Sequence, residues 1–228
     1  MRVDIWSDVV CPFCYIGKKR LENVARDTGI TLDIYWHSFE LDPNAPIQHD
    51  TSNTERLAQK YGRSLAETEE MERNIAAMAA QEGIDFQWKK ANSGNTFNAH
   101  RLIHLAQDKG LGNALKEAFF HAYMTEGEQI GQPEVIERIA IETGLKANDV
   151  NAVLNSNQYA ADVRQDEALA QQLKISGVPF FVFDQQWAVS GAQPKEVFLQ
   201  ILQQAEPSVT QDDAAQCNDE KCEIPVQK

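Results

Sequence analysis

The alternation of apolar and polar residues predicts that the chain opens with a strand, a helix and a second strand. Residues 3–6 are mostly apolar, and residues 31–39 alternate apolar and polar side chains as a half-buried strand does. Between them, residues 12–28 carry an apolar stripe at helical spacing, and Gly29 follows as a helix stop. A crossover helix of this kind predicts that the two strands are parallel and that the connection is right-handed.

A long helical region follows a polar loop at residues 42–52. Apolar residues recur at helical spacing through this region, and strand character is almost absent. Ser64 and Glu67 have the spacing of a capping box, and a last helix is expected at about residues 159–173. We therefore expect residues 51–174 to form a helical insertion domain.

Strand character returns after this region. Residues 177–183 form an apolar run, residues 184–186 suit a turn, and residues 187–190 form a second short run. This pattern predicts a β-hairpin. Pro194 then suits the start of a final helix, which carries an apolar stripe.

These patterns predict an α/β domain that is discontinuous in sequence. Residues 1–50 and 175–205 supply its strands, and the helical insertion separates the two parts. Residues 206–228 are polar and acidic, and are expected to form a mobile tail that carries Cys217 and Cys222.

The composition is that of an ordinary soluble globular protein. Of 228 residues, 43% are hydrophobic and 24% charged, with a formal net charge of −13. Nucleic acids and anionic membranes attract clustered Lys and Arg, so we expect neither partner. No apolar run reaches the ~18 residues of a membrane span, and the opening MRVDIW carries no secretion signal. We therefore expect a cytoplasmic protein.

Cys11 and Cys14 are the strongest candidates for chemistry. If Cys11 lies at the start of the first helix, the unpaired N–H groups and the helix dipole favour its thiolate. We therefore expect the pKa of Cys11 to fall below the free value of about 8.5. Cys14 lies one turn later on the same face and can close a disulfide. Cys11 would then act as the nucleophile and Cys14 as the resolving thiol of thiol–disulfide exchange.

Two other interpretations of this cysteine pair remain open from the residues alone. Cys11 and Cys14 could be buried core residues that happen to be close. They could instead join Cys217 and Cys222 in a zinc site with four thiolate ligands, although the spacing within the second pair is unusual for zinc. We expect no metal.

Four segments of the sequence resemble a known family. They are SDVVCPFCYIGKKRLE, NTFNAHRLIHLAQ, AYMTEGEQIG and SGVPFFVF, which begin at residues 7, 95, 122 and 176. Together they resemble the DsbA-like class of oxidoreductases, and most closely its FrnE-like cytosolic branch. The resemblance extends from residue 1 to about residue 205. It implies a thioredoxin fold, in which a central mixed β-sheet is flanked by helices, with a large helical insertion.

The resemblance also implies roles for the segment before the hairpin. Pro179 matches a cis-proline that faces the two cysteines, and the backbone of Val178 would pair with an extended substrate peptide. Phe13 is a further candidate for substrate binding, within an apolar rim whose other members are more expected in the core: Trp6, Tyr15, Phe180 and Phe181.

The expected function is that of a protein-disulfide reductase or isomerase. No prosthetic group is needed, and glutathione or thioredoxin would supply the electrons. The substrates would be proteins that contain disulfides or thiols. In the cytosol the dithiol should rest mostly reduced, which favours reduction or isomerisation over net oxidation.

Two other function classes remain. The same fold also occurs in glutathione-dependent transferases and isomerases of small molecules, but in those enzymes a serine usually takes the position of Cys11. A non-catalytic interaction protein that holds zinc is the third class. The presence of both Cys11 and Cys14 favours redox chemistry.

The remaining candidates are less specific. Cys217 and Cys222 could exchange electrons with the first pair, or could form an independent local disulfide. His100 and His104 have the spacing of two helical metal ligands, but packing roles are expected for both. Whether His37 or Glu40 reaches the dithiol is left open.

Overall fold

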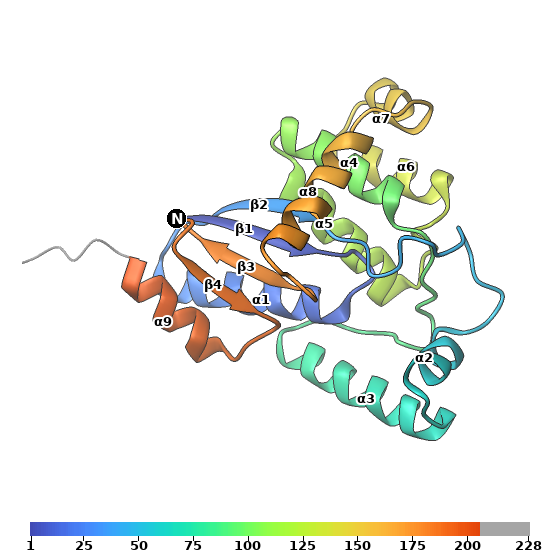
Figure 1. Ribbon diagram of the computed structural model, residues 1–228, viewed down its shortest axis with the longest axis horizontal. Coiled ribbons are helices and arrows are strands. Elements are labelled where there is room, and N and C mark those ends of the chain that lie inside the picture. Colours follow the sequence, from blue (N-terminus) through green and yellow to red (C-terminus); the bar gives the residue numbers. More distant parts are fainter. Residues whose placement is uncertain (206–228) are drawn as a thin grey trace, which may run out of the picture.

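A four-stranded mixed sheet lies at the centre of the computed structural model, which describes residues 1–205 (Figure 1). Its strand order is β2–β1–β3–β4, where the four strands in chain order are Arg2–Ser7, Asp33–Ser38, Phe180–Phe183 and Trp187–Ser190. β1 is parallel to β2 and antiparallel to β3, and β3 and β4 form an antiparallel hairpin. The predicted strand–helix–strand opening and the later hairpin are both confirmed.

Helix α1 (Pro12–Thr28) carries the two cysteines into the fold. Proline occupies its first turn, where the missing N–H costs nothing, and Gly29 ends it with φ 75° while its N–H bonds to the last carbonyls. The buried stripe of α1 packs below the sheet, beside α9 (Lys195–Ala205) (Figure 1).

Eight helical segments connect β2 to β3. They are α2 (Asn53–Tyr61), α3 (Leu65–Gln81), α4 (Phe97–Asp108), α5 (Gly112–His121), the π-helical turn η1 (Ala122–Glu126), α6 (Pro133–Glu142), α7 (Ala147–Leu154) and α8 (Ala160–Gln172). The predicted capping box of Ser64 and Glu67 begins α3, with both of its backbone hydrogen bonds present. Helices α4, α5 and α8 contact β2. Trp6 packs against α8 on one face of the sheet, whereas Trp36 shares its core with α1 and α5 on the other face (Figure 1). None of the helices within residues 1–205 combines the length and apolar character needed to cross a lipid bilayer.

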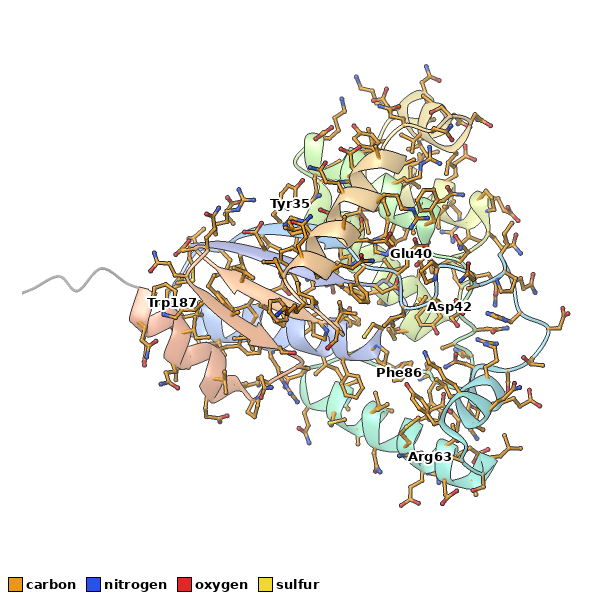
Figure 2. The ribbon with its side chains drawn as sticks, viewed as in Figure 1. Tyr35, Glu40, Asp42, Arg63, Phe86 and Trp187 are labelled. Carbon is orange, nitrogen blue, oxygen red and sulfur yellow. The ribbon has the colours of Figure 1, made fainter. Side chains whose placement is uncertain are left out.

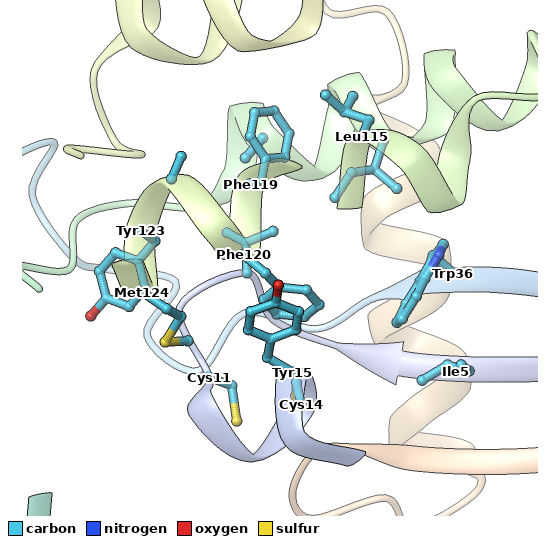
Figure 3. Close-up of a cluster of buried hydrophobic side chains, with 14 of the residues drawn as sticks. Ile5, Cys11, Cys14, Tyr15, Trp36, Leu115, Phe119, Phe120, Tyr123 and Met124 are labelled. Carbon is cyan, nitrogen blue, oxygen red and sulfur yellow. The ribbon is translucent and has the colours of Figure 1, made fainter. Parts of the chain in front are cut away.

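One hydrophobic core extends from the sheet into the helical region. Ile5 of β1 and Trp36 of β2 belong to the same buried cluster as Phe119 and Phe120 of α5 (Figure 3). Tyr15 of α1 stacks on Phe120 with ring centroids 4.9 Å apart. The division of the chain into two domains stays a prediction, and the apolar packing between these regions is continuous.

A buried ionic cluster attaches α8 to the sheet. Asp166 of α8 contacts His37 Nδ1 at 2.7 Å and accepts a hydrogen bond from the backbone N–H of Ser38, also at 2.7 Å. Asp4 of β1 contacts the other ring nitrogen of His37 at 2.9 Å. Trp6 stacks on the imidazole with centroids 4.2 Å apart. His37 therefore serves the packing of α8, and α8 leads directly into the segment before β3.

Candidate functional site

The two cysteines lie at the N-terminal end of α1, as predicted. Cys11 is the residue that precedes the first helical turn, and its carbonyl accepts a hydrogen bond from the Cys14 N–H at 3.1 Å. Both thiols are free and buried, with exposed fractions of 4% for Cys11 and 1% for Cys14. Figure 3 shows the pair at the lower edge of the core, beneath Tyr15.

The segment before β3 meets this pair, which the sequence also predicts. The peptide bond between Val178 and Pro179 is cis. The Cys11 thiol donates a hydrogen bond to the Val178 carbonyl, with sulfur and oxygen 3.7 Å apart. Gly17 of α1 makes this approach possible, because a Cβ there would lie 3.2 Å from Pro179 Cγ and 3.0 Å from Phe181 Cζ.

The expectation that the pKa of Cys11 falls below its free value is wrong. The interaction with the Cys14 thiol raises the pKa of Cys11 well above its ordinary value, and burial raises it further. The Cys14 backbone N–H opposes this increase but does not outweigh it, and the negative charge of Asp8 also raises the pKa. The helix-end argument counts only the backbone, whereas the sulfur is largely removed from water and has a second thiol beside it.

A cavity of about 590 Å³ opens beside Cys11. Phe13, Gly177 and Val178 line one part of it, and residues of α2 and α3 line another. Asp42 and Phe86, which are labelled in Figure 2, also belong to its lining. The lining is mixed in charge and includes Arg56, Lys60 and His49 as well as Asp8, Asp42 and Glu72. The cavity therefore leads to Cys11, the more exposed of the two thiols.

Of the predicted aromatic rim, Phe13 is the member that faces this cavity with a substantial exposed surface. Its exposed fraction is 39%. Trp6, Tyr15 and Phe181 are buried in the core, as the sequence leads us to expect for most of the rim. Phe180 is half-buried and packs against Trp6 rather than against the cavity.

Two buried charged groups near the dithiol escape the sequence analysis. The Asp8 carboxylate accepts a hydrogen bond from the Leu41 N–H at 2.8 Å and contacts His100 Nε2 at 3.3 Å. Lys116 of α5 donates from Nζ to the Ser7 carbonyl at 3.2 Å. The position of Asp8 in the cysteine motif is a signal that could have identified it, but nothing in the sequence marks Lys116 as buried.

The other polar candidates contact separate partners. His104 bonds to the Ser38 hydroxyl at 3.0 Å, so it does not share the Asp8 partner of His100, and both have the expected packing roles. Glu40 pairs with Arg164 at 2.5 Å and does not line the cavity; burial raises the pKa of Glu40 to about 7.

The zinc site and the second cysteine pair are the last two candidates from the sequence. Within residues 1–205 no three His, Cys, Asp or Glu side chains are grouped as metal ligands. Cys217 and Cys222 lie outside the described residues, so their proposed exchange with Cys11 and Cys14 stays a prediction.

Several known proteins are similar to this chain in sequence and fold. A probable DsbA oxidoreductase from Streptomyces coelicolor is 38% identical, with a TM-score of 0.83, and the match covers 99% of this chain and 100% of that one. The cytosolic disulfide reductase DsbM from Pseudomonas aeruginosa is 16% identical, with a TM-score of 0.62, covering 90% and 98%.

A 2-hydroxychromene-2-carboxylate isomerase is 18% identical, with a TM-score of 0.63, and the match covers 90% of this chain and 94% of the isomerase chain. At identities of 16% and 18%, the likeness to DsbM and to this isomerase shows a shared fold and nothing finer. DsbM is also known in a structure with GSH, at a TM-score of 0.59. Residues 2–203 match the DSBA-like thioredoxin domain. The chain therefore belongs to the DSBA-like thioredoxin domain family.

Proposed function

We propose that this protein is a thiol–disulfide oxidoreductase that reduces or isomerises disulfides in protein substrates through Cys11 and Cys14. The observation that carries the proposal is the hydrogen bond from the Cys11 thiol to the Val178 carbonyl at the edge of the cavity. It puts the more exposed thiol beside the backbone that would pair with an extended substrate. Phe13 and Val178 would contact the substrate, and Pro179 would hold the backbone of Val178 in place.

The reaction has two exchange steps. The Cys11 thiolate attacks one sulfur of the substrate disulfide, the S–S bond breaks, and the first substrate thiolate leaves. The Cys14 thiolate then attacks the Cys11 sulfur and releases the second substrate thiolate, which leaves a Cys11–Cys14 disulfide. Two thiols of glutathione, or one dithiol of thioredoxin, would reduce this disulfide and become oxidised to a disulfide in turn.

The ionisation of Cys11 favours the reducing direction. Strongly oxidising dithiols are those whose reduced form is stabilised by a thiolate of low pKa. Here the Cys14 thiol and burial raise the pKa of Cys11 instead, so the reduced form lacks that stabilisation. The centre would therefore donate electrons to substrates, in the manner expected for the FrnE-like branch in the cytosol.

Insulin reduction with glutathione as the electron donor tests this function. We expect wild-type protein to accelerate the reaction and Cys11→Ser to be inactive, because serine cannot form the mixed disulfide. Cys14→Ser should form the mixed disulfide but release substrate slowly, so multi-turnover activity should fall at least about tenfold. Full activity in Cys11→Ser would refute the proposal.

A glutathione-dependent isomerase or transferase of small molecules is the second candidate. The cavity of about 590 Å³ supports it, because that volume suits a small ligand. Such an enzyme needs one activating site for glutathione and no resolving thiol. Cys14→Ala would then retain full turnover with small electrophiles, whereas the proposed reductase would lose turnover with protein disulfides.

A further inference from the structure

Lys116 lies fully buried behind the dithiol, in the core between α5 and the sheet. Its exposed fraction is 0%, and its Nζ is 5.2 Å from the ring centroids of both Trp36 and Phe120. Figure 3 shows these two rings in the core above β1 and the dithiol turn. The Ser7 carbonyl, at the end of β1, accepts its hydrogen bond.

The ammonium group of Lys116 is under-satisfied for a buried charge. An ammonium can donate three hydrogen bonds, but within residues 1–205 Lys116 has one acceptor, a backbone carbonyl. Lys18, which is also buried, instead pairs with two carboxylates, Glu22 at 2.7 Å and Glu117 at 2.6 Å. A buried cation without a carboxylate bonded to it is costly, and such groups concentrate at functional sites.

The anionic groups that face Lys116 are the two thiols and one carboxylate. Burial lowers the pKa of Lys116 to about 8, and the opposing charge effects come from Cys14, then Asp8, then Cys11. The Asp8 carboxylate is already bonded to the Leu41 N–H and to His100, a neighbour that Lys116 repels. Tyr15, the residue after Cys14, stacks on the Phe120 ring that Lys116 faces, so Cys14 is the partner whose negative charge Lys116 is best placed to balance.

We propose that Lys116 is the buried counter-charge that stabilises the Cys14 thiolate during the second exchange step. This inference rests on the proposed thiol–disulfide function. Lys116 touches no substrate and acts through Cys14, so it is a positioning residue rather than a catalytic one. The sequence of proton and electron transfers remains that of ordinary thiol–disulfide exchange.

The need for a counter-charge arises once the substrate is attached to Cys11. The Cys14 proton then passes to solvent or to the substrate thiolate that left in the first step, and a negative charge forms on a sulfur that is 1% exposed. That charge is costly without a nearby cation. The thiolate attacks the Cys11 sulfur, the bond from Cys11 to the substrate breaks, and the second substrate thiolate leaves. Lys116 keeps its proton throughout.

The test separates the two steps with an aromatic disulfide whose released thiolate is coloured. The first release reports attack by Cys11, and the second reports resolution by Cys14. In Lys116→Met we expect the first rate to stay within about twofold. The second rate should fall about tenfold at pH 7, because the fraction of Cys14 present as thiolate falls about tenfold without the cation. The second rate should recover as the pH is raised, because alkali forms the thiolate without the cation.

Lys18→Met is the matched control, because it removes a second buried lysine that faces carboxylates rather than the dithiol. Both release rates should be unchanged in it. Unfolding midpoints of both variants exclude a general structural loss, and Lys116→Met should be at least as stable as wild type because it removes an under-satisfied buried charge. An unchanged second rate at pH 7, or an equal fall of both rates at every pH, would overturn the inference.

A measurement on the wild type covers the case in which Lys116→Met does not fold. NMR titration of the Lys116 side chain should give a higher midpoint when Cys11 is alkylated and Cys14 is free than in the Cys11–Cys14 disulfide form, because only the first form can carry a Cys14 thiolate. Equal midpoints would reject the counter-charge. Failure of the wild type to release both coloured thiolates would instead reject the proposed function, whatever Lys116 does.

Discussion

Gly17 determines how closely the dithiol helix approaches the segment that holds the cis peptide. A Cβ at this position would lie 3.0 Å from Phe181 Cζ and 3.2 Å from Pro179 Cγ. Phe181 is fully buried and cannot move aside without disturbing its contact with Phe198. A side chain as small as alanine would therefore push α1 and the segment apart, and with them Cys11 and Val178.

Gly17→Ala should lower both stability and insulin reduction. Overpacking of this kind costs about 1–3 kcal/mol, which exceeds the gain of about 1 kcal/mol from the better helix propensity of alanine. Denaturant unfolding measures the first effect and turnover the second. Arg26→Ala, at an exposed position of the same helix, should change stability by less than about 0.5 kcal/mol. A Gly17→Ala protein more stable than wild type would contradict the close approach.

Single residues show where sequence reasoning succeeds at this site. The positions of Cys11 and Cys14 could be predicted from their spacing at a helix start, and the cis peptide at Pro179 from the family resemblance. The burial of Lys116 could not be predicted, because a lysine beside apolar helical residues looks like any solvent-facing position. The prediction of a low pKa for Cys11 failed for the same reason, because that pKa depends on burial by helices distant in sequence.

At the scale of elements, boundaries with their own chemical signals were predictable. Helix α1 has the bounds that Pro12 and Gly29 predict, and α3 begins at its capping box. The π-helical turn Ala122–Glu126 was not predicted, because its apolar residues continue the spacing of α5. The attachment of α8 to the sheet was also missed, since Asp166 and His37 are far apart in sequence.

The ion pairs of His37 should make the attachment of α8 dependent on pH. Burial alone would lower the pKa of His37, but Asp166 and Asp4 outweigh it and raise the pKa. The stabilisation is therefore fully present below the unfolded value of about 6.5 and is lost as pH rises through the folded value. Hydrogen bonds from Arg2 and His37 lower the pKa of Asp4, and those from His104 and His37 lower the pKa of Asp166, so the contribution of the two carboxylates is lost in acid.

His37→Gln should destabilise the protein by about 2 kcal/mol near pH 5.5 and by less at pH 9. Urea unfolding at both pH values measures the difference. His121→Gln, at an exposed position, is the matched control and should show no such dependence. A loss of stability in His37→Gln that is the same at pH 5.5 and pH 9 would show that the imidazole is neutral in its contacts with the two carboxylates.

At the scale of the whole molecule, the dithiol lies where the sheet and the helical region share their core. Cys11 and Cys14 belong to the same buried cluster as Phe120 of α5 and Trp36 of β2. The sequence predicts a separate helical insertion because its periodicity changes abruptly at both ends. It cannot show that the apolar faces on the two sides pack against each other, because periodicity identifies a buried face but not its partner.

This continuous core predicts that the sheet and the helical region unfold together. In Trp88→Phe the remaining tryptophans, Trp6, Trp36 and Trp187, all lie on strands, so fluorescence reports the sheet. Far-UV circular dichroism reports mainly the helices. We expect coincident midpoints for the two signals, because melting of α5 would expose Phe120 and Trp36 and remove the cover of the dithiol. Loss of helical signal at a lower denaturant concentration than loss of fluorescence would instead mean that the helical region folds on its own, and that the environment of Cys14 can change while the sheet stays intact.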